Sequence, residues 1–297
     1  MVIIGLLALL CLANLLLVFE KKLPSPANGR LDKVRAGDGV AVLYIQGSLS
    51  PQPVQSLLGD SGTESMLDQL RDFEHDKRVR ALILRIDSPG GSVGASQELY
   101  AEILRFKKRT GIPVVASIAD IGASGAYWIA MASDYIFANP GSLVGSIGVI
   151  VNGWDFTQVQ KRYGIGMTTF KSVAHKDMLS GWRENTPEEK KLVQDMLLDI
   201  QSQFEEAVQA GRHLKPKAVH ALADGRIFTG RQAMKANLVD GLGTIEDAID
   251  YAAEKAGIAG QPSLISKPKP TLFDFFEGFR NMSFLKPGSE QQLPILQ

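Results

Sequence analysis

The chain has 297 residues, of which 45% are hydrophobic and 22% are charged, so it is long enough for one large globular domain with additional segments, or for two small domains. Lysine plus arginine balances aspartate plus glutamate at 32 each, so the charge gives no reason to expect nucleic acid as a partner. The single cysteine, Cys11, lies in an N-terminal apolar run, which excludes an intramolecular disulfide and a cysteine-based zinc site or catalytic dyad in the rest of the chain. We expect no cofactor and no metal.

Residues 2–19 form that apolar run, with eighteen uncharged residues. As a helix they would extend about 27 Å, close to the thickness of a bilayer core. We therefore predict a transmembrane anchor over residues 1–22, and the alternatives are a buried core helix or a cleaved signal peptide, which the small residues at 25–27 leave open. Lys21 and Lys22 follow the run, and by the positive-inside rule they favour a cytoplasmic location for the rest of the chain.

Residues 23–39 mix proline, glycine and charge without apolar periodicity, which indicates a linker. After the linker, apolar runs closed by glycine, serine or proline alternate with stretches of helical pattern. This alternation predicts an α/β fold built from βαβ units. The expected strands are 40–50, 80–91, 113–120 and 134–142, and the expected helices between them are 92–108 and 125–132.

A long amphipathic helix is expected over 187–213, with a proline in its first turn and acidic residues after it. Residues 223–258 indicate a short strand and two helices, and the main domain, residues 40–260, ends there. The remaining tail, residues 261–297, contains a proline-spaced linker and an aromatic cluster. Such a cluster is more often a docking segment than a ligand site, although contact with a membrane surface is an alternative.

Ser124 stands between glycine and alanine, where an apolar helix is about to begin. The start of a helix exposes unpaired N–H groups and carries a partial positive charge. A serine there is either a helix cap or a nucleophile whose developing oxyanion is stabilised.

A nucleophilic serine needs a base, and His175 and Lys176 are adjacent candidates. If their stretch is extended, only one of the two can face a given pocket. A lysine serves as a base only if its pKa is lowered from ~10.4 by about three units, which burial in an apolar pocket can achieve. The other histidines (His75, His213 and His220) lie in polar segments that favour the solvated surface.

The sequence DSPGGSVG at residues 87–94 follows an expected strand. A proline and two glycines at that place make a tight turn into a helix, with backbone N–H groups free to point at an anionic centre. The turn is either an oxyanion hole or an ordinary strand-to-helix connection. Phosphate binding is disfavoured because neither common glycine-rich phosphate motif is present, and the nucleophile-elbow pattern also fails at Ala126.

Together, DSPGGSVGAS, the glycine- and alanine-rich segment around Ser124, FKSVAHKDMLSGWRENTPEE and DGRIFTGRQAMKANLVDGLG resemble the signal peptide peptidase A family of bacteria and archaea. Members are membrane-anchored serine proteases with a Ser-Lys dyad, and the resemblance covers about residues 40–260. It implies that Ser124 is the nucleophile and Lys176, 52 residues later, its base. It also implies oxyanion donors at Gly91 and Gly125, and that Ser146 holds the lysine amine.

The resemblance further implies a spiral of βαβ units like that of the Clp protease and of crotonases, in a short form with one protease domain. Implied partners are hydrophobic peptides, such as the remnants of cleaved signal peptides, and copies of the same chain in a ring, often an octamer. The resemblance also implies a single-pass membrane protein with an extracytoplasmic protease domain. Lys21 and Lys22, by contrast, favour a cytoplasmic location.

Two other functions are left open by the residues. A crotonase-type acyl-CoA hydratase or isomerase would use the same paired N–H donors without a nucleophilic serine. A catalytically silent membrane scaffold would need no neutral lysine, so the combination of Ser124, Lys176, Gly91 and Ser146 argues against it.

Overall fold

The computed structural model describes residues 37–51, 55–56, 59–60 and 62–266. The expected transmembrane anchor and nearly all of the expected linker and tail lie outside these residues. Among the residues that are described, no helix has the length and apolar character needed to cross a membrane.

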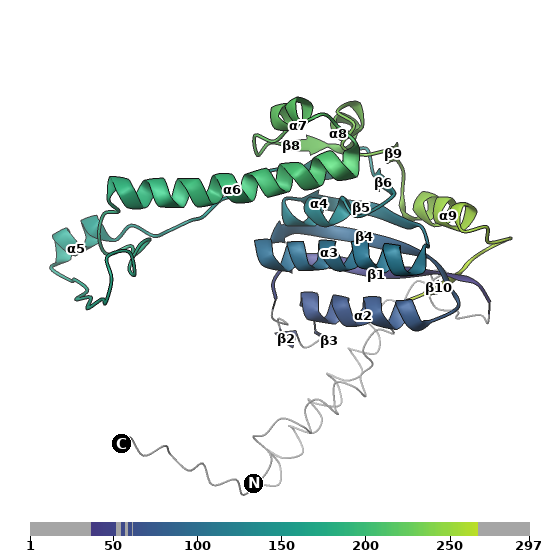
Figure 1. The fold of residues 1–297 in the computed structure, drawn as a ribbon, viewed down its shortest axis with the longest axis horizontal. Coiled ribbons are helices and arrows are strands. Elements are labelled where there is room, and N and C mark those ends of the chain that lie inside the picture. Colours follow the sequence, from purple (N-terminus) through teal and green to yellow (C-terminus); the bar gives the residue numbers. More distant parts are fainter. Residues whose placement is uncertain (1–36, 52–54, 57–58, 61, 267–297) are drawn as a thin grey trace, which may run out of the picture.

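A mostly parallel sheet forms the centre of the fold (Figure 1). Its strands lie in the order β10-β1-β4-β5-β6-β9 with parallel neighbours, while β7 pairs with β5 in parallel and with β8 in antiparallel orientation. The predicted α/β fold of βαβ units is thereby confirmed. The strands are β1 (Gly39–Leu49), β4 (Val79–Gly91), β5 (Val114–Ala123), β6 (Tyr135–Ala138), β7 (Leu143–Gly145), β8 (Ile227–Thr229), β9 (Gly241–Leu242) and β10 (Ser263–Ile265), with a separate pair β2 (Gln55–Ser56) and β3 (Gly59–Asp60).

The central strands contain continuous apolar runs, at residues 40–45 of β1 and 81–84 of β4, because both faces of the sheet are covered there. Leu43 on β1 and Leu84 on β4 are register partners, and both contribute to the core on one face. Their neighbours Val42 and Ile83 contribute to the core on the other face. Successive side chains thus point to opposite, equally buried sides, as strand geometry requires.

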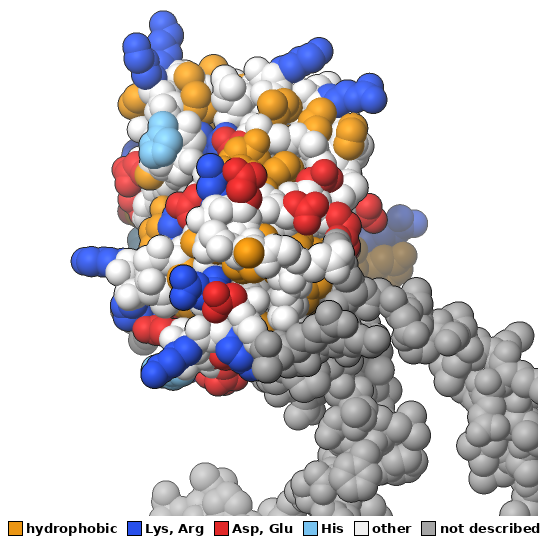
Figure 2. All heavy atoms as spheres, turned by 90° about the vertical axis from the view of Figure 1, so that its right-hand side faces the viewer, with side chains coloured by type: hydrophobic (Ala, Val, Ile, Leu, Met, Phe, Trp, Pro, Cys, Tyr) orange, Lys and Arg blue, Asp and Glu red, His pale blue; other side chains and the backbone are white. Residues whose placement is uncertain are grey.

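Helices cover the two faces unequally. One face carries α2, α3 and α4, and the other carries α9. Charged side chains of both signs lie scattered among hydrophobic ones on the end of the molecule that Figure 2 shows. The helices are α2 (Thr63–His75), α3 (Val93–Thr110), α4 (Gly125–Ala130), α5 (Thr157–Tyr163), α6 (Pro187–Arg212), α7 (Pro216–Leu222), α8 (Gly230–Lys235) and α9 (Ile245–Lys255).

Residues 149–200, which we call the arm, project away from the remaining described residues, which we call the body (Figure 1). The arm contains α5, the connection after it and the first half of α6. Only the second half of α6 packs on the body, where Phe204, Ala207 and Val208 are buried. The first half has no comparable apolar contact, since its one buried side chain is Glu189.

The junction between arm and body depends on one aromatic stack. The rings of Trp128 on α4 and Phe204 on α6 lie parallel with centroids 4.6 Å apart, and Phe204 is fully buried. We expect Phe204→Ala to lower the free energy of unfolding by about 3–5 kcal/mol, because the substitution removes the stack and leaves a cavity. Urea unfolding measures the loss, and Leu198→Ala on the exposed part of the same helix should change stability by no more than about 0.5 kcal/mol. Equal losses in the two variants would contradict this account of the junction.

Candidate active site

Ser124 links the end of β5 to the start of α4 and has an unusual backbone conformation. Its φ is 52° and its ψ is −126°, a region that residues with side chains rarely adopt. Two hydrogen bonds hold it: its N–H donates to the carbonyl of Gly145 at 2.8 Å, and its own carbonyl accepts from the N–H of Trp128 at 3.0 Å. The side chain makes no capping hydrogen bond, so of the two roles open to this serine the cap is not used.

The glycine turn at the end of β4 lies directly against Ser124. A Cβ placed on Gly90 would lie 2.7 Å from the Gly125 nitrogen and 2.9 Å from the Ser124 Cβ. A Cβ placed on Gly125 would lie 3.5 Å from the Gly91 nitrogen. The two expected oxyanion donors and the expected nucleophile are therefore neighbours, at the start of a helix whose first N–H groups have no partner within the helix.

Ser146 reaches the same edge of the sheet from β7. Ala123 on β5 and Gly145 on β7 are register partners, so Ser124 and Ser146 are the first residues after two neighbouring strands. Ser146 also has a positive φ, 49°, and its N–H donates to the carbonyl of Arg226 at 2.9 Å. Ser124, Ser146 and the two glycines thus meet where the parallel strands end, the usual place for a site in this kind of fold.

Lys176 lies elsewhere, in a run of turns between α5 and α6 in the arm, and its side chain is exposed. The segment between α5 and α6, which carries Lys176, lies apart from α4, at whose start Ser124 stands (Figure 1). The segment is not extended, so the condition under which His175 and Lys176 would point to opposite faces is not met. His175 instead approaches Glu188 and Glu189, each at 3.8 Å.

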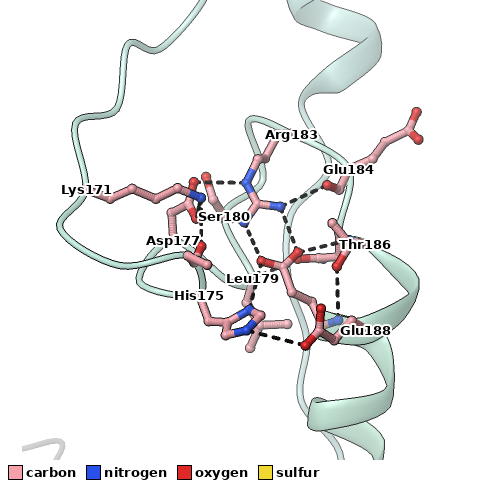
Figure 3. A network of polar contacts seen from close by, with 12 residues as sticks. Lys171, His175, Asp177, Leu179, Ser180, Arg183, Glu184, Thr186 and Glu188 are labelled. Carbon is pink, nitrogen blue, oxygen red and sulfur yellow. Dashed lines mark hydrogen bonds and ion pairs between the residues drawn. The ribbon is translucent and has the colours of Figure 1, made fainter.

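A network of charged residues surrounds the turn that carries Lys176 (Figure 3). Arg183 contacts Asp177 and Glu189, with N–O distances of 2.7 and 2.6 Å. The hydrogen bonds from Arg183 and the Thr186 N–H lower the pKa of Glu189 to about 2, and those from Arg183 and Lys171 hold the pKa of Asp177 well below its usual range. Sequence reasoning missed this network, although Thr186 followed by Glu189 has the spacing of a helix capping box, which the structure contains.

Comparisons with known proteins identify the family of the chain. The model of peptidase family S49 matches residues 106–259, more than half of the chain. "Putative protease slr0021" of Synechocystis sp. is 44% identical over 216 residues, which cover 71% of this chain and 77% of that protein. "Putative signal peptide peptidase SppA" of Enterococcus faecium is 38% identical over 187 residues, covering 63% of this chain and 54% of the relative.

A third relative, "Putative protease MJ0651" of Methanocaldococcus jannaschii, is 37% identical over 193 residues, which cover 65% of this chain and 61% of the relative. The match thus spans little more than half of the second and third relatives, but more than three quarters of the Synechocystis protein. The family match includes Ser124, Ser146 and Lys176. By the extent of these matches, the chain belongs to peptidase family S49, the serine peptidases that include proteins named signal peptide peptidase.

Proposed function

We propose that the protein is a membrane-anchored serine endopeptidase that cleaves hydrophobic peptides, including signal peptides already released from their proteins. The Lys176 amine takes the proton from the Ser124 hydroxyl, and the serine oxygen attacks the peptide carbonyl carbon. The N–H groups of Gly91 and Gly125 receive the charge on the carbonyl oxygen. The ammonium then protonates the leaving amine, and water releases the acyl group from the serine.

The observation that carries this proposal is the position of Ser124. Its hydroxyl makes no capping hydrogen bond at the start of α4, and the Gly90–Gly91 turn lies against its backbone. A crotonase-type hydratase would use the turn but not the serine, and membership of a peptidase family favours hydrolysis of peptides. Conversion of Ser124 to an acyl-enzyme is the chemical step that distinguishes the two.

The base is supplied by a neighbouring copy of the chain in this proposal. Lys176 belongs to the arm, which projects away from the body that carries Ser124, so a dyad requires the arm to reach another body (Figure 1). The arm exposes large apolar side chains that a partner would cover, as interfaces between subunits do. Among the described residues of the arm these include Ile150, Trp154, Tyr163, Ile165, Met167, Phe170 and Val173, all more than half exposed.

A head-to-tail contact of this kind, with an arm on one surface and a serine site on another, is heterologous and closes into a ring if the rotation allows. We propose that subunits with the spiral fold assemble into a ring-shaped homo-oligomer, as the family resemblance implies. The usual form of such a ring is an octamer. Residues 1–22 anchor it in the cell membrane, with the protease domain outside the cytoplasm. The apolar run of residues 2–19 supports the anchor.

Mixing two inactive variants tests the shared site. Ser124→Ala retains the lysine and Lys176→Ala retains the serine, so each alone should be inactive against an apolar fluorogenic peptide. Oligomers re-formed from equal amounts should recover about a quarter of the activity, because one interface in four combines an intact serine with an intact lysine.

Absence of recovery in mixed oligomers that have demonstrably exchanged subunits would contradict a dyad shared between subunits. A Lys176→Ala variant that is active alone, together with a His175→Ala variant that is inactive alone, would assign the base to the histidine. Either result leaves the family assignment unaffected and changes only the catalytic machinery.

A further inference from the structure

The turn that carries Lys176 has no packed core of its own, and it is held by backbone hydrogen bonds and by charged side chains. Residues 164–186 contain no helix or strand, and the buried side chains of the arm are limited, in the described chain, to Thr157 and Glu189. A packed core therefore does not fix this segment. The ring of Trp182 does contact that of Phe156, with centroids 5.1 Å apart, but this contact lies beyond the turn itself.

Arg183 is the centre of the network that replaces a core (Figure 3). Its Nε and Nη2 donate to the two carboxylate oxygens of Asp177 at 2.9 and 2.7 Å. Its Nη1 and Nη2 donate to the two carboxylate oxygens of Glu189 at 2.8 and 2.6 Å. Nη1 also donates to the carbonyl of Glu184 at 3.1 Å, so five acceptors engage the five N–H groups of one guanidinium.

The two carboxylates that Arg183 joins belong to different parts of the arm. Glu189 lies in the first turn of α6, fully buried, where its carboxylate also accepts from the N–H of Thr186 at 2.9 Å and lies 3.8 Å from His175. Asp177 directly follows Lys176 and also accepts from Lys171 at 2.7 Å. Arg183 therefore ties the residue next to Lys176 to the start of a long helix.

We propose that Arg183 is a positioning residue for peptide hydrolysis, holding Asp177 against Glu189 so that the turn presents Lys176 to the serine of the neighbouring subunit. This inference rests on the proposed function, because it concerns the base of that reaction. Within the described residues the Lys176 amine has no hydrogen bond or ion pair, so the network fixes its backbone and leaves the amine available.

The geometry of the guanidinium makes the role specific to arginine. A planar fork can bind two carboxylates side by side, whereas an ammonium group cannot reproduce four such bonds at once. Displacement of a catalytic group by about 1 Å costs on the order of 100-fold in rate. Loss of the network should therefore reduce catalysis strongly while the body of the protein stays folded.

The test compares Arg183→Met with Arg78→Met in the full-length protein. Arg78 is a matched control because it also makes a bidentate pair, with Asp76, on the surface of the body. Arg183→Met should lower kcat by about 100-fold with KM changed less than about twofold, and Arg183→Lys should restore only a minor part of the loss. Arg78→Met should retain wild-type kcat, and hydrogen exchange should accelerate in residues 171–186 of the first variant alone.

The pH profile separates positioning from a general loss of structure. The base acts in its neutral form, so a change in its surroundings should shift the pH of half-maximal kcat in Arg183→Met. A mere decrease in folded protein lowers the rate equally at every pH and leaves the midpoint unchanged.

Three results would overturn the inference or its basis, and each rejects a different part of it. Full kcat in Arg183→Met, with Lys176→Ala inactive, rejects the positioning role and keeps the dyad. Full activity in Lys176→Ala rejects the proposed base itself. A loss in Arg183→Met with an unchanged pH midpoint and unchanged exchange in residues 171–186 assigns Arg183 to overall stability or to contact with the partner.

Discussion

Lys176→Met is expected to lower kcat/KM for an apolar peptide by about 10³-fold or more, without a change in thermal stability. The reason for the loss is that the serine hydroxyl is a weak nucleophile unless a base removes its proton. The reason for the unchanged stability is that Lys176 is exposed, in a turn, with a side chain that the described residues leave unpaired. Steady-state kinetics and a melting curve on the same preparation measure both effects.

Lys190→Met provides the matched control, because Lys190 is another exposed lysine of the arm, in the first turn of α6. It should retain activity within about twofold. Comparable losses in both lysine variants would mean that positive charge on the arm, rather than one specific amine, is required for activity. Such a result would be incompatible with the Ser-Lys dyad.

Gly90→Ala is expected to cause the second large loss, of about 100-fold to 1,000-fold in kcat, which is the usual effect of disturbing one oxyanion donor. The new Cβ would lie 2.7 Å from the Gly125 nitrogen, 2.9 Å from the Ala123 carbonyl oxygen and 2.9 Å from the Ser124 Cβ. Two of these atoms are backbone and none can move alone, so the turn and the serine must separate. The positive φ of Gly90, 95°, adds strain, on the order of 1–3 kcal/mol.

Gly94→Ala is the control for this substitution. Gly94 lies four residues later in α3, and a Cβ there meets no atom within 4 Å. Alanine in place of glycine inside a helix raises stability by about 0.5–1 kcal/mol, so this variant should be active and slightly more stable. An active Gly90→Ala variant would show that the turn is not part of the oxyanion site.

The part of the site contributed by the body was predictable from local patterns. Apolar runs closed by glycine or serine marked β4 and β5, and parallel neighbours end at the same edge. Gly91, the last residue of β4, and Ser124, the first residue after β5, therefore lie at the same edge. The helix expected after Ser124 is confirmed as α4, although it ends at Ala130 and is shorter than expected.

The arm was not predictable in the same way. The sequence indicates an amphipathic helix over 187–213 but does not say what covers its apolar side. In the structure Leu192 and Met196 are exposed, while Phe204 is buried, so one helix serves both the arm and the body. The surroundings of Lys176 escape prediction because they depend on Arg183 joining residues six positions away on either side, which follows no helical or strand period.

Short strands also lay beyond the reach of periodicity. β7, with three residues, places Ser146 beside Ser124, but so short a run carries no alternation that a sequence pattern could reveal. β10 lies beyond Gly260 in the sequence and pairs with β1. The sheet therefore includes residues past the point where the main domain was expected to end. The edges of this sheet are decided by tertiary pairing and not by local propensity.

The separation of Ser124 from Lys176 within a single chain has a consequence for the cell that makes the protein. If the dyad is shared as proposed, a newly synthesised copy is an inactive precursor, because its serine hydroxyl has no base within reach. Proteolytic activity would then arise only where several copies assemble. Other polypeptides that a single copy meets before assembly would not be cleaved.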